Sequence, residues 1–288
     1  MNRRTFLQTT AGLSALTLAG FASEARPKMK SVGLQLYTLR DDIKTQGIEK
    51  ILAEVAKLGY KEVENFGYGQ GKFFGKTPTE YNKILKDNGL SAISGHYQTG
   101  RATGATDGLT KNWEKVVEDA VSIGHKYAMI AYLPDNERKA EDYKQLFDLL
   151  NKGTEVAKKA GLTLGYHNHD FEFTQKIEGE KPYDLFLKNT GVAMEMDLYW
   201  VVKAGEEPAE YFAKYPGRFP LWHIKDMANS PQREFAEVGT GTIDFGDLFK
   251  HAKHAGLKHY FVEQDVCKRP PLESIKISID NIEKAKWG

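Results

Sequence analysis

The 288-residue sequence has only one cysteine, Cys267. An intramolecular disulfide is therefore impossible, and zinc modules that need several thiolates are excluded. A charge excess of one sign is also missing, because 40 lysine and arginine residues balance 39 aspartate and glutamate residues to a formal net charge of +1. Proteins that bind nucleic acids usually carry a basic excess, so we expect no nucleic-acid partner.

Long hydrophobic runs are missing as well. No apolar stretch reaches the roughly 18 residues of a membrane-spanning helix, and the mean hydropathy is −0.52, so we expect no stable membrane span. No Gly-x-Gly-x-x-Gly motif follows the first predicted strand, which leaves a dinucleotide site without support. Gly239-Thr240-Gly241 lacks the lysine of a phosphate loop, and we find no other phosphate cradle.

Residues 1–25 have the parts of an export signal. The pair Arg3-Arg4 precedes a short apolar stretch over residues 11–21 and the small residue Ala25. Paired arginines before Phe-Leu resemble the twin-arginine type. We therefore expect cleavage after Ala25, one catalytic domain over residues 26–288 and a periplasmic product. The alternative is a fortuitous N-terminal helix.

From Ser31 onward, short apolar runs alternate with longer amphipathic stretches. We predict strands over residues 32–37, 62–66, 90–96, 127–133, 162–169, 192–197, 221–226 and 260–265. We predict helices over residues 48–58, 79–88, 109–123, 138–160, 182–189, 208–215, 245–255 and 272–285. Strict alternation with short connections favours a parallel sheet, and eight such units in roughly 250 residues match a closed (β/α)8 TIM barrel. An open doubly wound sheet is the alternative.

Four late predicted strands end in pairs of polar residues. Alternation along a strand places the members of each pair on one face. The pairs are His167 with His169, Glu195 with Asp197, His223 with Lys225, and Glu263 with Asp265. The C-terminal strand ends of a TIM barrel carry the chemistry, so these imidazole and carboxylate groups are expected to converge. Taken singly, each residue has a plainer interpretation, as a hydrogen-bonded core histidine or as a carboxylate that caps the next helix.

Mixed nitrogen and oxygen donors without thiolates favour a divalent metal ion. A cation would also offset the cost of burying several charges together. We expect one ion, with Mn, Zn, Co, Mg and Fe all compatible with these donors.

Seven segments carry a family resemblance: GLQLYTLRD (33–41), GYKEVENFGYG (59–69), GYHNHDFEF (165–173), MDLYW (196–200), WHIKDM (222–227), EVGTGTIDF (237–245) and FVEQD (261–265). Together they resemble the xylose-isomerase-like TIM-barrel family of sugar isomerases and epimerases. The resemblance implies one divalent ion whose ligands match Asp197, His223 and Glu263. At the fourth ligand position, where the family usually has glutamate, this sequence has His167. That pattern is similar to the inosose-dehydratase branch.

The histidine at position 167 has a chemical consequence. In the epimerases of the family, two glutamates flank the substrate and act as the two bases, and only Glu263 is present here. A second base would have to be His169, Glu172 or Glu64. A β-elimination needs no second base. Lys225 is expected to stabilise an enediolate oxygen, and a salt bridge to Glu195 or Asp226 is the alternative.

Substrate contacts are predicted at His96, Trp200, Glu64 and Arg218, against the alternatives of packing, helix capping or solvation. Gln35 is a weaker candidate. Aromatic residues near the loops are further candidates to line a sugar pocket: Tyr37, Phe66, Tyr68, Phe73, Phe74 and Tyr97.

The sequence thus predicts a metal-dependent isomerase or epimerase of a small, unphosphorylated sugar, which removes a proton next to a carbonyl and passes through an enediolate. The close alternative is a lyase or dehydratase that acts by β-elimination on a keto sugar or 3-keto-glycoside. An endonuclease-type barrel and a non-catalytic sugar-binding barrel are two further alternatives. The oligomeric state stays open.

Overall fold

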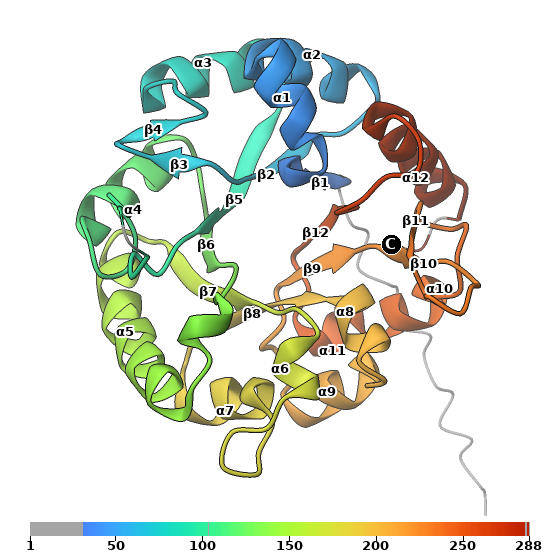
Figure 1. Cartoon of the computed structure of the whole chain (residues 1–288). Helices are drawn as coiled ribbons and strands as arrows, with labels where there is room; N and C mark the ends of the chain where they lie inside the picture. Colours follow the sequence, from blue (N-terminus) through green and yellow to red (C-terminus); the bar gives the residue numbers. More distant parts are fainter. Residues whose placement is uncertain (1–30, 103, 286, 288) are drawn as a thin grey trace, which may run out of the picture.

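The computed structural model describes residues 31–102, 104–285 and 287, and these form a closed barrel (Figure 1). The export signal predicted for residues 1–25 lies outside the described residues. Eight parallel strands make up the barrel wall: β1 (Gly33–Gln35), β2 (Glu62–Asn65), β5 (Ser91–Tyr97), β6 (Tyr127–Ile130), β7 (Thr163–His167), β8 (Ala193–Asp197), β9 (Leu221–Ile224) and β12 (His259–Val262).

The strands follow one another around the barrel in chain order, and β1 closes it. Gly33 of β1 pairs with Glu62 of β2 on one side and with Phe261 of β12 on the other. This closure confirms the predicted (β/α)8 TIM barrel, and the open doubly wound sheet is wrong.

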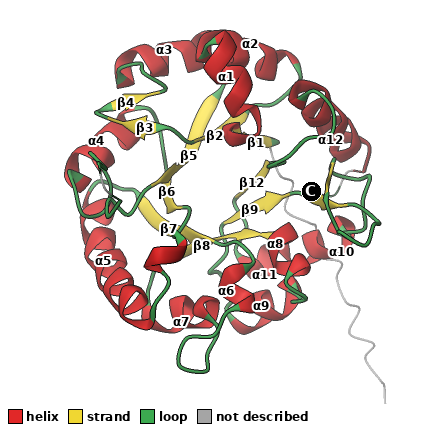
Figure 2. Ribbon diagram, in the orientation of Figure 1, coloured by secondary structure: helices red, strands yellow, loops and turns green. Residues whose placement is uncertain are grey.

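Helices form an outer ring around the strands (Figure 2). They are α1 (Arg40–Gln46), α2 (Ile48–Lys57), α3 (Pro78–Asp87), α4 (Trp113–Ser122), α5 (Ala140–Lys159), α6 (Phe171–Thr174), α7 (Pro182–Asn189), α8 (Leu198–Lys203), α9 (Pro208–Lys214), α10 (Phe245–Leu248), α11 (Ala252–Ala255) and α12 (Pro271–Ala285). Short 3-10 helices occur at η1 (Leu36–Leu39), η2 (Asp135–Glu137) and η3 (Phe249–His251). Two small hairpins, β3 (Tyr68–Gly69) with β4 (Lys72–Phe73) and β10 (Asp226–Met227) with β11 (Phe235–Ala236), lie outside the barrel wall. No helix of the described residues is both long and apolar enough to cross a bilayer.

All eight predicted strands are present, but several end earlier than predicted. The first one stops at Gln35, because the Gln35 side chain accepts a hydrogen bond from the Tyr37 N–H and the chain turns into η1. The helix predicted over residues 245–255 is three short pieces, α10, η3 and α11. Helices α6 and α8 were not predicted, since each is very short and begins almost directly at a strand end.

Large side chains fill the barrel interior away from the site. Met129, Leu221 and Phe261 form a small buried cluster there. A Cβ on Gly165 would overlap the Met129 sulfur, so only glycine fits beside that side chain. The main hydrophobic core lies between strands and helices, where Trp222 of β9 stacks on Phe212 of α9 with ring centroids 4.7 Å apart. This filled interior is the support for the polar residues at the strand ends.

Candidate active site

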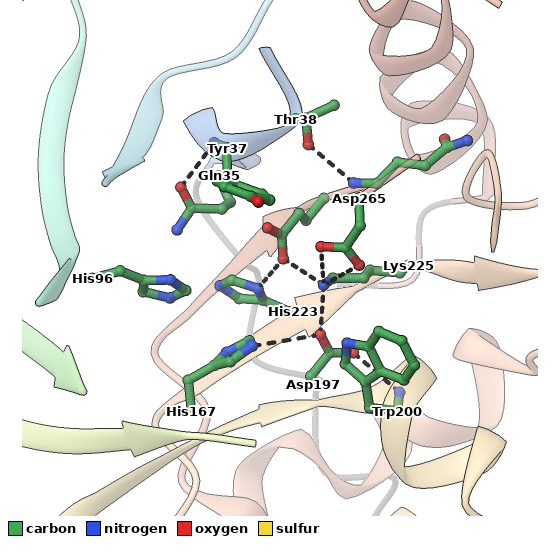
Figure 3. A network of polar contacts seen from close by, with 12 residues as sticks. Gln35, Tyr37, Thr38, His96, His167, Asp197, Trp200, His223, Lys225 and Asp265 are labelled. Carbon is green, nitrogen blue, oxygen red and sulfur yellow. Dashed lines mark hydrogen bonds and ion pairs between the residues drawn. The ribbon is translucent and has the colours of Figure 1, made fainter. Parts of the chain in front are cut away.

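Polar side chains from the late strands meet at the C-terminal end of the barrel (Figure 3). The register of the sheet pairs His167 of β7 with Glu195 of β8, and Asp197 of β8 with His223 of β9. Neighbouring strands therefore bring these side chains to one level. Lys225, Glu263 and Asp265 come just after β9 and β12, so they lie in loops rather than in the predicted strands.

Lys225 lies among three carboxylates. Its ammonium nitrogen is 2.8 Å from Asp197 Oδ2, 2.7 Å from Glu263 Oε2 and 2.9 Å from Asp265 Oδ2 (Figure 3). These partners replace the salt bridge to Glu195 or Asp226 that the sequence left open. Although Lys225 is buried, Asp197 and Asp265 outweigh burial and hold its pKa well above the usual value.

The His223 ring lies between two carboxylates. Its Nδ1 is 2.7 Å from Glu263 Oε2, and its Nε2 is 2.5 Å from Glu64 Oε2. Burial would lower the pKa of His223, but Glu195 and Glu263 outweigh it and raise that pKa well above its usual value.

His167 of β7 also lies between two carboxylates, both from β8. Its Nδ1 is 3.0 Å from Glu195 Oε2, and its Nε2 is 3.7 Å from Asp197 Oδ2. Burial and the nearby His223 lower the pKa of His167 well below the usual value. Each of the two rings thus has one nitrogen beside a carboxylate at a strand end and the other beside a wholly buried glutamate.

His96 of β5 completes the cluster. Its Nε2 is 2.8 Å from Glu195 Oε2 and 3.2 Å from Glu64 Oε2. Burial lowers the pKa of His96, but Glu64 and Glu195 outweigh burial and raise it to about 9. Gln35 donates a 2.8 Å hydrogen bond to Glu64, which makes this weaker sequence candidate a support for the cluster.

The carboxylates at the strand ends differ in their protonation equilibria. Burial raises the pKa of Asp197 to about 6, despite the charge of Lys225. Burial would also raise the pKa of Glu263, but Lys225 and His223 outweigh it and hold that pKa well below the usual range. Glu263 is therefore ionised at neutral pH.

Two overlapping groups of side chains have donor atoms within 4.8 Å of one another. We call them the carboxylate-rich set, which is His167, Asp197, His223 and Glu263, and the histidine-rich set, which is His96, His167, Glu195 and His223. Both consist of nitrogen and oxygen donors, which suits Zn²⁺, Mn²⁺, Co²⁺ or Fe²⁺.

The balance of charge also fits a cation. Glu64, Glu195, Asp197 and Glu263 are each at most 4% exposed, whereas the network contains one buried ammonium, that of Lys225. Burying unbalanced charge costs several kcal/mol per ion. Either protons on the histidines or a divalent cation would supply the missing positive charge.

A cavity of about 510 Å³ opens above this network. Six of the sequence-predicted site residues line it: His96, His167, His169, Trp200, Lys225 and Glu263. Asp197 and His223 are wholly buried and lie outside its lining. The remaining lining residues are Tyr37, Arg40, Phe66, Gly67, Gln98, Ala131, Tyr132, Asp265 and Val266.

Two of the predicted substrate contacts, Arg218 and Glu64, also lie outside the cavity lining. The Arg218 guanidinium donates to the backbone carbonyls of Leu187, Thr190 and Val192, before β8 begins and so at the opposite end of the barrel. This placement corrects the predicted substrate contact and gives Arg218 a structural role. Glu64 is wholly buried beneath His96 and His223, so it supports rings rather than touching substrate.

Glu172 is buried as well, which removes it from the candidates for a second base. It accepts hydrogen bonds from the Tyr166 hydroxyl at 2.6 Å and from the His169 N–H at 2.8 Å. Of the predicted aromatic residues, only Tyr37 and Phe66 line the cavity. Tyr68, Phe73 and Tyr97 pack against one another and against His125 instead.

The Gly-Thr-Gly segment binds a carboxylate of the chain itself. Asp226 accepts hydrogen bonds from the backbone N–H groups of Met227, Gly239, Gly241 and Ile243, at 2.8 to 3.1 Å. A Cβ on Gly241 would overlap Asp226 Oδ1, so the segment folds tightly only with glycine there. The segment therefore fixes the position of Asp226, which directly follows Lys225. Its backbone N–H groups bind this carboxylate rather than a phosphate group.

Several functional residues were missed or left without a role by sequence reasoning. The sequence pattern pairs Glu195 with Asp197 but gives Glu195 only a possible salt bridge to Lys225. Because Glu195 lies two residues before Asp197 on β8, both side chains point to the same face of the strand. Arg40, Tyr132 and Val266 lie in loops or at a helix start, and no periodic signal points to them.

The family model of the xylose isomerase-like TIM barrel matches residues 52–285. A solved structure of a sugar phosphate isomerase/epimerase from Parabacteroides distasonis ATCC 8503 is 30% identical, with a TM-score of 0.75 over 89% of this chain and 98% of the other. The structure of IOLI protein with a bound zinc atom shares the fold, at 14% identity and a TM-score of 0.68 over 89% and 98% of the two chains.

An inosose dehydratase from Clostridium perfringens is 31% identical over 153 residues, which are 46% of this chain and 51% of the relative. The chain thus spans about half the length of the curated relatives it matches.

Proposed function

The chain belongs to the xylose isomerase-like TIM barrel family, and on this premise we propose that it is a divalent-metal-dependent sugar isomerase or epimerase that removes the proton next to a carbonyl group. The position of Glu263 carries the proposal. Its carboxylate lines the cavity and also belongs to the carboxylate-rich set, so the same group can meet both a substrate and an ion.

We assign the ion to the carboxylate-rich set. His223 Nδ1 and His167 Nε2 face Glu263 and Asp197, while their other nitrogens face Glu64 and Glu195. Metal-bound histidines commonly donate their second ring nitrogen to such a carboxylate. The zinc atom in the IOLI structure lends support to a metal in this fold, and the two imidazoles with two carboxylates suit Zn²⁺, Mn²⁺, Co²⁺ or Fe²⁺ better than Mg²⁺. Bound there, the ion supplies a Lewis acid that polarises the substrate carbonyl.

The residues of the chain then have separate tasks. Glu263, ionised and beside the cavity, accepts the proton from the carbon next to the carbonyl. Lys225 keeps its proton and adds positive charge where the enediolate oxygen develops. His96 and Trp200 line the cavity and orient the sugar. Glu64 and Glu195 hold the two ligand histidines.

One observation disfavours a two-base epimerisation. Within the described cavity lining, the only carboxylates are Glu263 and Asp265, and both follow β12. On the β7 side, separated from β12 by β8 and β9, the lining groups are the imidazoles of His167 and His169. A two-base epimerisation needs groups on both faces of the sugar, so His169 would have to be the second base here. Aldose–ketose isomerisation and β-elimination need one base. The inosose dehydratase relatives lend support to a lyase.

Proton NMR in D₂O tests the proposal, with metal-loaded protein and a panel of free ketohexoses and 3-keto-glucosides. We expect deuterium at the carbon next to the carbonyl, together with a new isomer. Loss of water or aglycone, with an unsaturated keto sugar as the product, would favour the lyase. Absence of both deuterium incorporation and an elimination product with every substrate of the panel would overturn the shared first step.

A matched pair of variants assigns the base. Glu263→Gln is expected to remove the deuterium incorporation, while Glu155→Gln, on the exposed face of α5, leaves it unchanged. Full activity in Glu263→Gln would contradict the role of Glu263.

Export stays a proposal that rests on the sequence of residues 1–25. Cell fractionation and N-terminal sequencing test it. We expect a periplasmic product that begins after Ala25, and an intact N-terminus in a cytoplasmic fraction would contradict it.

A further inference from the structure

The mouth of the cavity carries exposed hydrophobic side chains. In the described part of the chain, four large hydrophobic side chains are strongly exposed: Tyr37 at 39%, Val121 at 38%, Tyr132 at 44% and Val266 at 62%. Three of the four, Tyr37, Tyr132 and Val266, line this one cavity. A ligand that enters this cavity would therefore meet exposed hydrophobic side chains at its mouth.

The exposed groups lie on both sides of the opening. Tyr37 and Val266 follow β1 and β12, which are neighbours in the barrel, whereas Tyr132 follows β6, which lies opposite β12. We call Tyr37, Tyr132 and Val266 the rim. A flat ring that enters between these groups would contact apolar surface on both of its faces.

Neighbouring side chains hold the two tyrosines in place. The Tyr37 ring packs edge-on against Phe66 at 5.4 Å, and Arg40 lies 4.4 Å from its centroid. The Tyr132 ring packs edge-on against His169 at 5.2 Å, and Arg138 lies 5.2 Å from its centroid. The two tyrosines of the rim are therefore packed in place before a ligand arrives, which lowers the entropic cost of binding.

Below the rim, two lining residues each have an unpaired polar atom. Trp200 Nε1 and His169 Nδ1 are buried without a hydrogen-bond partner among the described residues, and both residues line the cavity with ring centroids 5.8 Å apart. A buried polar atom without a partner is unfavourable. Because both atoms are enclosed by the protein, sugar oxygens would reach them only after the two side chains turn toward the cavity.

Two cations are described in the cavity lining, Arg40 and Lys225, and both already donate within the chain. The Arg40 guanidinium donates to the carbonyls of Tyr37 and Asp265, at 3.0 and 2.9 Å. Lys225 is enclosed by three carboxylates. A phosphate would also face Glu263 and Asp265, so the cavity favours a neutral ligand.

We propose that the substrate is a neutral glycoside, in which a sugar ring lies over the polar network and a second, flat ring lies between the side chains of the rim. A cavity of about 510 Å³ has the size of sites for ligands larger than one hexose. This inference rests on the proposed function for the identity of the sugar end, and it adds a subsite for the aglycone.

Binding of unreactive probes tests the subsite apart from catalysis. Phenyl β-D-glucopyranoside and D-glucose lack the keto group and are compared by calorimetry on the metal-loaded, full-length protein. We expect the phenyl glucoside to bind about tenfold more tightly, and Tyr132→Ala and Tyr37→Ala each to weaken it by about fivefold, the size of one aromatic contact. Affinity for glucose should not change.

The exposed valine outside the cavity provides the matched control. Val121→Ala, on α4, removes a similarly exposed side chain and should change neither affinity. Equal affinities for the two probes, rim variants that behave like Val121→Ala, or tighter binding of glucose 6-phosphate than of the phenyl glucoside would each overturn the subsite. Deuterium exchange into free ketoses without any preference for a glycoside would leave the proposed function standing and remove this inference. A preference for the phenyl glucoside without deuterium exchange or elimination would support the aglycone subsite but contradict the proposed function.

Discussion

Glu64 illustrates how a residue that never touches substrate controls the candidate site. It is wholly buried and lies against one nitrogen of His223, whose other nitrogen faces Glu263. We expect Glu64→Gln to keep the hydrogen bond but to lose the charge, and therefore to weaken metal affinity by about 10- to 100-fold.

Competition with a chelator measures the effect of Glu64→Gln. Glu62→Gln is the matched control, because Glu62 lies two residues earlier on β2 and pairs with His259, away from the site. Equal metal affinities for the two variants would show that Glu64 does not act through His223.

Glu172 is expected to make stability depend on pH. Burial raises its pKa to about 7, despite the hydrogen bonds from Tyr166 and His169. A pKa above that of the unfolded chain means that the folded state holds the proton more strongly. Its stabilising effect is therefore fully present below about pH 4.3, the unfolded value, and is lost as the pH rises toward 7. The loss amounts to about 3 kcal/mol.

Urea unfolding between pH 5 and pH 8 checks this expectation. Glu172→Gln should flatten the fall in the free energy of unfolding, while Glu155→Gln, on the exposed face of α5, should keep the wild-type slope. Identical slopes for all three proteins would contradict a raised pKa at Glu172.

Part of the site could be predicted residue by residue. Active sites of TIM barrels lie at the C-terminal ends of the strands. This rule alone points to the four residues at or near those ends, which are His167, Asp197, His223 and Glu263. Arg218 shows the limit, because it precedes β9 and the same rule assigns it to the opposite end. Side chains such as Tyr132 could not be predicted, since loop conformation does not follow from hydrophobic periodicity.

At the scale of elements, the loop between β11 and α10 depends on one glycine. Gly241 lies so close to Asp226 and Met227 that a Cβ would overlap both. We expect Gly241→Ala to cost about 1–3 kcal/mol of stability and to reduce turnover, because Asp226 adjoins Lys225. Thermal unfolding and activity measure the two effects.

Gly191 is the control, since no described atom lies within 4 Å of the point that a Cβ would occupy there, and Gly191→Ala should be neutral. A Gly241→Ala protein as stable and active as Gly191→Ala would refute the role of the loop.

The strong periodic elements followed from the sequence, and the short ones did not. Helix α7 spans Pro182–Asn189, as predicted, because Pro182 begins it and its apolar spacing is regular. Helix α8 has only six residues and is fixed by Asp197, which accepts a hydrogen bond from the Trp200 N–H. Asp197 therefore caps helix α8 and also belongs to the carboxylate-rich set. The spacing of residues in the sequence could not show that one side chain does both.

At the scale of the whole molecule, metal binding should stabilise the fold. Four carboxylates buried together destabilise the protein unless positive charge offsets them. Metal at about 100 times its Kd adds about 2.7 kcal/mol, so removal of the metal with EDTA should lower the Tm by about 5–10 °C. Differential scanning calorimetry measures the shift, and Asp197→Asn should reduce it. No change in Tm when metal is returned would contradict a structural contribution of the ion.

The most direct test of the central claim is anomalous diffraction from crystals of the metal-loaded protein. We predict one peak between His167 Nε2, Asp197, His223 Nδ1 and Glu263, with Lys225 keeping its pairing with Asp265. A peak among His96, His167, Glu195 and His223 instead, or no peak at the strand ends, would contradict the assignment of the metal and, with it, the role of Glu263.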